Sequence, residues 1–157
     1  MPKYLTYDQA LKKLQHYCAY QDRCHSEVRS KLLDLGIYGM DLENIITELI
    51  SENFLNEERF ARSYARGKFR MKKWGRGKIT QNLKKKKVSA YCIRKAMEEI
   101  EEEDYLKTLE EIIIKRMGPT EDWTFALFQK TGKYALQRGY ESHLVWAIIS
   151  KMKVKVT

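Results

Sequence analysis

The sequence predicts an all-α fold made of three tandem three-helix repeats that form an elongated, curved rod. Only two prolines and eight glycines interrupt 157 residues, of which 43% are apolar and 32% charged, a composition typical of helices. Apolar residues recur every three or four positions, and the apolar pattern itself recurs along the chain. A three-helix unit of about 50 residues buries little surface alone, so neighbouring units are expected to stack.

The first repeat is expected at about residues 5–53. An amphipathic helix is predicted over roughly 7–20, where Ala10, Leu11, Leu14 and Tyr17 share one face. A pair of helices follows, with apolar residues spaced i, i+4 and then i, i+3, i+4, i+7. Gly36 marks the break between the two helices of the pair.

The second repeat, about residues 54–103, is predicted from a shift of 51 positions. Its first helix is expected over 55–73, and Lys78 is expected to open the second. The apolar positions that stay apolar after the shift are Val28, Leu32, Ile37, Leu42, Ile45, Ile46 and Leu49, which fall on Ile79, Leu83, Val88, Ile93, Ala96, Met97 and Ile100.

The third repeat, about residues 104–157, is fainter. Its first helix is predicted over 104–117, and a shift of 103 places Gly36 on Gly139 and Ile37 on Tyr140, followed by a matching apolar helix. The upstream half matches poorly. The three repeats together predict a single domain, residues 1–157.

The charge is concentrated in the middle of the chain. The net charge is +9, and residues 54–97 contain 15 Lys and Arg but two Asp and Glu, which favours a polyanionic or acidic partner. Three cysteines without paired spacing indicate a reducing compartment, and no apolar run is long enough to cross a bilayer. We therefore expect a cytoplasmic protein with no membrane contact, and a monomer, because no heptad seam is sustained.

The helix expected over 55–73 segregates its cations. At 100° per residue, Arg59, Arg62, Arg66, Arg70 and Lys73 fall within an arc of about 80°. No acidic residue is expected to relieve their repulsion inside this stripe, so a partner that supplies negative charge is the better explanation. The opposite face, expected to enter the core, carries Phe60, Tyr64 and Met71.

Two further basic features follow the stripe. The sequence Trp74-Gly75-Arg76-Gly77 predicts a flexible corner whose glycines would let the backbone approach a phosphate. The run 84–87 cannot share one helical face, and capping electrostatics and polyanion contact are equally good explanations of it. Residues 79–96 also resemble a helix-turn-helix with Ser89 as the N-cap, although the acidic residues at 98–104 would repel phosphates.

We find no catalytic centre and expect no cofactor. His16, Cys18, Cys24 and His25 lack the spacing of a zinc site, and the carboxylates of 98–104 are typical of a solvated helix end. The chain is therefore expected not to be an enzyme, and not to bind a metal.

The sequence Phe54-Leu55-Asn56-Glu57-Glu58-Arg59-Phe60-Ala61-Arg62-Ser63-Tyr64, with Lys73-Trp74-Gly75-Arg76-Gly77-Lys78-Ile79, resembles the RecX family of recombinase regulators. The upstream Ser26-Glu27-Val28-Arg29-Ser30-Lys31-Leu32 resembles a second motif of that family. Agreement covers roughly residues 8–152. Glu57 stands where the family commonly has Asp, and the third repeat is recognisable mainly through Arg138-Gly139-Tyr140.

The resemblance implies a rod of three helical repeats that binds the RecA–DNA filament along its groove and reduces ATP hydrolysis, strand exchange and co-protease activity. Its implied partners are RecA and the backbone phosphates of single- and double-stranded DNA. A helix-turn-helix-like or non-specific binder of duplex DNA is the alternative. The candidate filament- and DNA-binding residues are Arg59, Arg62, Arg66, Arg70, Lys72, Lys73, Arg76, Lys78, Lys84 and Lys85.

Overall fold

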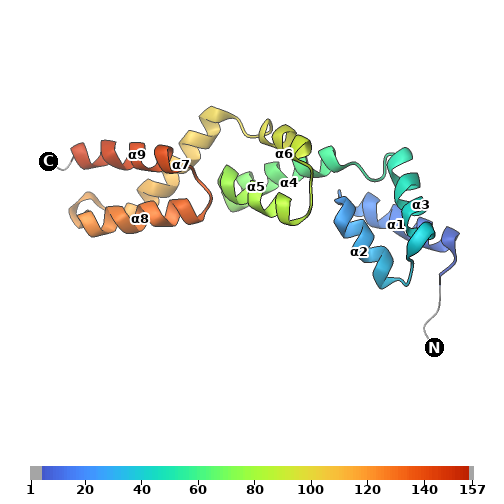
Figure 1. Cartoon of the computed structure of the whole chain (residues 1–157). Coiled ribbons are helices and arrows are strands. Elements are labelled where there is room, and N and C mark those ends of the chain that lie inside the picture. Colours follow the sequence, from blue (N-terminus) through green and yellow to red (C-terminus); the bar gives the residue numbers. More distant parts are fainter. Residues whose placement is uncertain (1–4, 156–157) are drawn as a thin grey trace. The chain divides into compact units, whose positions relative to one another are not determined.

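The computed structural model describes residues 5–155, which form α-helices and one short 3-10 helix but no β-strand (Figure 1). The all-α prediction is confirmed. Residues 1–4 and 156–157, which belong to the predicted domain, lie outside the described residues. The elements are α1 Tyr7–Tyr20, α2 His25–Asp34, α3 Gly39–Ser51, α4 Glu57–Lys72, α5 Arg76–Lys85, α6 Ala90–Met97, α7 Glu102–Met117, η1 Thr120–Asp122, α8 Phe125–Gln137 and α9 Ser142–Val154.

Side chains that accept backbone N–H groups mark several helix starts. Thr6 caps α1 in a reciprocal capping box with Gln9, whose side-chain oxygen accepts the Thr6 N–H at 2.9 Å. Ser89 Oγ accepts the Cys92 N–H at 3.2 Å, so the predicted cap of α6 is present. Thr124 caps α8 through the Leu127 N–H at 3.1 Å. Such caps satisfy N–H groups that have no partner inside the helix.

Three helices end in the same way at positions separated by the predicted shifts. Gly36, Lys87 and Gly139 follow α2, α5 and α8, and each has a positive φ, of 80°, 62° and 99°. The next residue is buried and donates its N–H back over the helix end: Ile37 to Leu32, Val88 to Leu83 and Tyr140 to Ala135, at 2.9, 3.1 and 3.3 Å. This is the Schellman pattern, and it explains why an apolar residue recurs after each break.

The chain divides into two compact units. The first contains residues up to Tyr64 together with Leu83–Ala96. Helices α1, α2 and α3 pack against one another there. Their shared core is made of Ala10, Leu14, Cys18, Val28, Leu32, Ile37, Leu42, Ile45, Ile46, Leu49 and Leu55.

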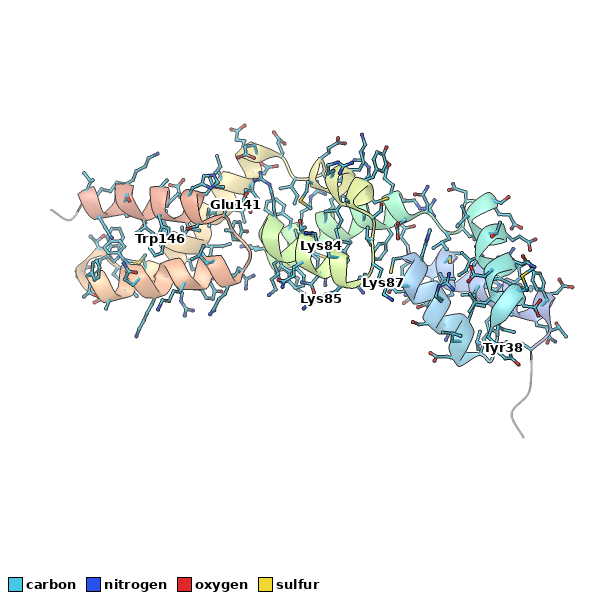
Figure 2. The ribbon with its side chains drawn as sticks, in the orientation of Figure 1. Tyr38, Lys84, Lys85, Lys87, Glu141 and Trp146 are labelled. Atoms are coloured by element: carbon cyan, nitrogen blue, oxygen red, sulfur yellow. The ribbon has the colours of Figure 1, made fainter. Side chains whose placement is uncertain are left out.

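The second unit contains Ala65–Asn82 and the chain from Met97 onward. Helices α7, α8 and α9 pack against one another, and the fully buried Tyr105 of α7 is in contact with two other rings. The Tyr105 centroid lies 5.8 Å from that of Phe69 and 5.0 Å from that of Tyr140. Trp146 of α9, labelled in Figure 2, packs over Gly132 of α8, where a β-carbon would overlap the indole.

The buried face of α4 differs in part from the prediction. Phe60 is buried and Tyr64 is half-buried, as expected, but Met71 is 83% exposed. Ala61, Ala65 and Phe69 fill the buried face instead. The prediction relied on large apolar side chains. It missed this face because small alanines let neighbouring helices pack closely.

Candidate functional site

Arg59, the first cation of the predicted stripe, is held by the first unit. Its Nε donates to Asp22 at 2.6 Å, and its other nitrogens donate to Asn53 and to the carbonyl oxygen of Phe54 at 3.1 to 3.3 Å. These bonds fix the connection between α3 and α4. Most of the hydrogen-bonding capacity of this guanidinium is therefore used within the chain.

The next two arginines of α4 also have acidic partners. Arg62 Nε lies 3.2 Å from Glu58, one helical turn earlier. Arg66 pairs with Glu99 in the second unit. The expectation that no acidic residue relieves the stripe is thus wrong: one partner is local, and Asp22 and Glu99 come from distant segments.

The C-terminal end of α4 is different. Arg70, Lys72 and Lys73 are exposed, and none of them has an ion-pair partner among residues 5–155. Lys73 follows the helix with a positive φ of 57°. The charge of the predicted stripe is therefore available to a ligand at this end of the helix.

The Trp74–Lys78 corner is tied to the loop between α8 and α9. The N–H groups of Gly75 and Gly77 donate to the carbonyl oxygens of Arg138 and Gly139 at 2.7 and 2.8 Å. A β-carbon at Gly75 would overlap the Gly139 backbone, and one at Gly77 would lie 2.9 Å from the Gly139 oxygen. The glycines thus allow an approach within the chain, where the sequence predicted an approach to a phosphate, and α5 begins at Arg76 rather than at Lys78.

Arg76 is the centre of a partly buried polar cluster in the second unit. Its guanidinium pairs with Glu141 at 2.6 Å and with Glu102, and its Cζ lies 3.8 Å from the centroid of the Tyr105 ring. Burial opposes the charge of Arg76, but hydrogen bonds to Glu141 and Glu102 outweigh burial and raise its pKa. Burial, followed by the hydrogen bond to Glu141, raises the pKa of Tyr105. This geometry is that of a structural cluster.

The remaining predicted cations lie in α5. The Lys78 ammonium lies 4.5 Å from the centroid of the Trp74 ring, a cation–π contact. Lys84 and Lys85 are exposed at the C-terminal end of α5 (Figure 2), where cations also complement the helix dipole. Lys86 differs, because its carbonyl oxygen accepts the Ser26 hydroxyl at 2.8 Å. Both explanations of the run 84–87 stay open.

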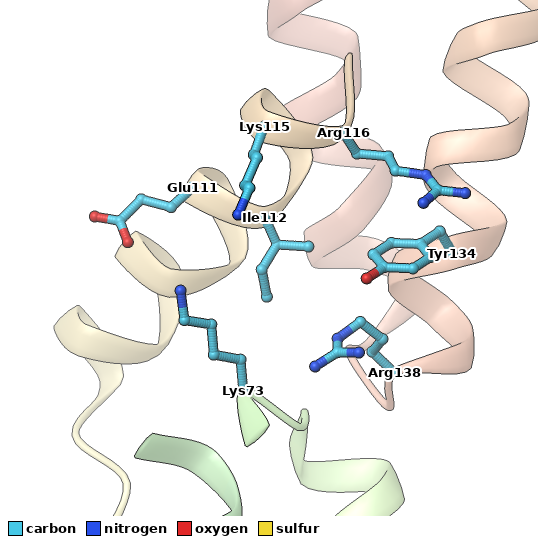
Figure 3. A pocket seen from close by; sticks show the side chains of 7 residues that line it. All are labelled: Lys73, Glu111, Ile112, Lys115, Arg116, Tyr134 and Arg138. Atoms are coloured by element: carbon cyan, nitrogen blue, oxygen red, sulfur yellow. The ribbon is translucent and has the colours of Figure 1, made fainter. Parts of the chain in front are cut away.

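The second unit has a basic pocket of about 650 Å³ that the sequence did not predict. It lies between the end of α4, α7 and α8, and Lys73, Glu111, Lys115, Arg116, Tyr134 and Arg138 line it (Figure 3). Of these residues, only Lys73 and Arg138 belong to the sequence motifs described above, and they lie 65 positions apart in the chain. The nearest sequence signal is the pair Lys115-Arg116 at the end of a helix whose other charged residues, apart from Lys107, are acidic.

Other chemistry has little support among the described residues. No group of three or more His, Cys, Asp and Glu side chains is arranged there to hold a metal ion. Cys18, Cys24 and Cys92 are buried and unpaired, and burial raises the pKa of the Cys18 thiol to about 11. Within residues 5–155, every helix is too short or too polar to cross a bilayer.

Comparisons with known proteins find similarity to RecX proteins along most of the chain. The family model described as the second three-helix domain of RecX matches residues 56–97. The regulatory protein RecX of Streptococcus uberis is 25% identical over 142 residues, or 89% of this chain and 54% of that protein. The chain matches 36% of the corresponding protein of Lactobacillus johnsonii, with 31% identity. It thus spans about half or less of these curated relatives, but 87% of the Haemophilus ducreyi protein, at 26% identity.

Solved structures agree with the fold. The crystal structure of RecX from Lactobacillus salivarius superposes with a TM-score of 0.84 at 21% identity, covering 94% of this chain and 97% of that one. A second crystal structure, of a regulatory protein RecX, gives a TM-score of 0.81 at 21% identity and covers 90% and 72% of the two chains. With the sequence matches, these likenesses show that the chain has the fold of the RecX structures and is similar to RecX proteins in sequence along most of its length.

Proposed function

We propose that this chain is a non-enzymatic regulator that binds the RecA–DNA filament and inhibits its ATPase, recombinase and co-protease activities. The observation that carries the proposal is the match of residues 56–97 to the second three-helix domain of RecX, in the segment that holds most of the positive charge. The protein acts as a cytoplasmic monomer without a cofactor. Its partners are RecA and DNA phosphates.

The ion pairs within the chain shorten the list of residues that we propose as filament contacts. Arg59 forms an ion pair with Asp22, Arg66 with Glu99, and Arg76 with both Glu102 and Glu141. Because these carboxylates neutralise much of their charge, we assign the three arginines mainly to holding the helices together. Binding to the filament is assigned to the cations that keep their charge exposed, which are Arg70, Lys72, Lys73, Lys84 and Lys85.

The test measures the single-strand-dependent ATP hydrolysis of RecA with increasing amounts of this protein, at two salt concentrations. Binding to the bare strand is measured in parallel. We expect inhibition at concentrations below those that coat the bare strand, and weaker inhibition at high salt. Inhibition that begins only when the strand is saturated would refute filament recognition. A preference for particular duplex sequences in competition with random duplex would favour the helix-turn-helix alternative.

The variant Arg70→Gln/Lys72→Gln tests the residue assignment. Both side chains are exposed without an ion-pair partner among the described residues, so their loss is expected to weaken inhibition without unfolding the chain. The matched control is Lys12→Gln/Lys13→Gln, which removes the same charge from the exposed face of α1. Reversal of Arg62 or Arg66 is a poorer test, because a glutamate there would face Glu58 or Glu99 and loss of folding would imitate loss of binding.

A further inference from the structure

The basic pocket of the second unit gathers charge from three segments of the chain. Lys73 follows α4, Lys115 and Arg116 end α7, and Arg138 follows α8; Glu111 is the carboxylate in the lining. Figure 3 shows Lys73 and Lys115 extending towards the same opening, with Arg116 and Arg138 on either side of Tyr134. With four cations and one carboxylate the lining is net positive, and a hollow dominated by one sign of charge focuses the electrostatic potential.

These four cations are not neutralised inside the chain. No carboxylate among residues 5–155 forms an ion pair with any of them, whereas Arg59, Arg62, Arg66 and Arg76 all have acidic partners. Four like charges in one hollow repel one another, and folding gains nothing from their proximity. A ligand that carries negative charge would relieve the repulsion.

Two of the cations are held in place without loss of charge. The Arg116 and Arg138 guanidiniums lie 4.2 and 5.6 Å from the centroid of the Tyr134 ring, and Arg138 also donates to the Lys72 carbonyl oxygen. Stacking on an aromatic ring orders a guanidinium and leaves N–H groups at its edge for an oxyanion. The planar fork of donors then suits phosphate.

The basic surface continues beyond this pocket. A second hollow, of about 320 Å³, lies between the ends of α4 and α7, shares Lys73 and Glu111 with the first, and adds Arg70, Lys107 and the carboxylate of Asp104, so its lining is still net positive. A single small anion would occupy only part of one hollow. Two adjoining hollows that share a lysine suit a chain of regularly spaced negative charges.

We propose that the pocket lined by Lys73, Lys115, Arg116 and Arg138 binds successive phosphates of a nucleic-acid strand, through the backbone and without sequence preference. The choice of a strand over a free polyphosphate of the same chemistry rests on the proposed function and on the second hollow. An acidic protein segment is the competing macromolecule. The third repeat, which matched most weakly in the sequence, thereby contributes a DNA contact of its own.

The test titrates the whole chain against a fluorescein-labelled oligothymidylate at several salt concentrations, without RecA. The variant is Lys115→Gln/Arg116→Gln, two exposed side chains, and the matched control is Lys12→Gln/Lys13→Gln. Each phosphate contact with a single strand contributes about 0.7 to the slope of log K against log salt. The pocket variant should therefore lose about 1.4 from that slope and bind about 25-fold more weakly at 0.1 M salt, while the control keeps nearly the full slope.

Each outcome decides the matter. An unchanged slope and affinity in the pocket variant would overturn the proposal, as would displacement of the strand by an equal phosphate concentration of triphosphate, or loss of RecA binding with strand binding intact. If circular dichroism shows that the double variant is unfolded, Lys115→Gln alone should bind about fivefold more weakly. Strand binding that depends on the pocket in a chain that fails to inhibit RecA would support this inference and refute the proposed function.

Discussion

Gly75 gives the sharpest test of why the corner before α5 contains glycines. Its N–H donates to Arg138 at 2.7 Å, the neighbouring Gly77 N–H donates to Gly139 at 2.8 Å, and a β-carbon on Gly75 would overlap the Gly139 backbone. Replacement by alanine must separate the two backbones. Both hydrogen bonds would be lost or stretched.

The expected cost follows from these contacts. Two hydrogen bonds contribute about 1 kcal/mol each, and forcing a methyl group into a packed site costs about 1–3 kcal/mol. We therefore expect Gly75→Ala to lower the free energy of unfolding by about 3–5 kcal/mol. For a chain of this size, that corresponds to a fall in Tm of about 6–20 °C.

Gly67 is the matched control, because it lies inside α4, in the same unit, and a β-carbon there would meet no atom within 4 Å. Gly67→Ala should raise stability by about 0.5–1 kcal/mol, since alanine favours the helix. The assay is urea unfolding of both variants followed by circular dichroism. Equal stability of Gly75→Ala and Gly67→Ala would refute this account of the corner, and a loss of strand binding by a fully stable Gly75→Ala would restore its phosphate-binding interpretation.

Three further predictions concern buried polar groups. Glu141→Gln should destabilise the chain by about 2 kcal/mol in urea unfolding, because Arg76 loses an anionic partner and Tyr105 an anionic acceptor; a double-mutant cycle with Tyr105→Phe should show coupling. Burial raises the pKa of Tyr105 and Tyr140, so stability should be intact below pH about 10 and fall as pH rises above it; a flat profile from pH 8 to 11 would contradict this. The pKa of Cys18, about 11, leaves about one thiol in a thousand ionised at pH 8, so Ellman's reagent should react far more slowly with the native chain than with the unfolded one.

Much of the helical architecture could be predicted because it depends on local spacing. The shift of 103 aligns Gly36 with Gly139 and the shift of 51 places Gly36 on Lys87, and all three residues adopt the left-handed conformation that ends a helix. Lys87 shows that such a helix end does not require a glycine and so cannot be found from glycine positions alone. The helix end is set by the following buried apolar residue and its N–H bond as much as by the glycine.

The partners of the basic helix could not be predicted in the same way. An angular projection of α4 correctly gathers Arg59 and Arg66 on one stripe, but their carboxylates, Asp22 and Glu99, lie 37 and 33 positions away. Only the packing of other helices brings those carboxylates to the stripe. The exception is Glu58, whose position four residues before Arg62 is visible in the sequence.

Net charge therefore overstates the surface that a segment such as 54–97 offers to a polyanion. Counterion release on binding counts phosphate contacts, and a guanidinium already paired with a carboxylate must give up that partner to make one. Arg116 and Arg138 come from segments with a lower net positive charge than 54–97, yet they keep N–H groups free beside Tyr134. The cations that bind most strongly should be those that the fold brings together without neutralising them, and this property belongs to the packing of α7 and α8 rather than to any single stretch of sequence.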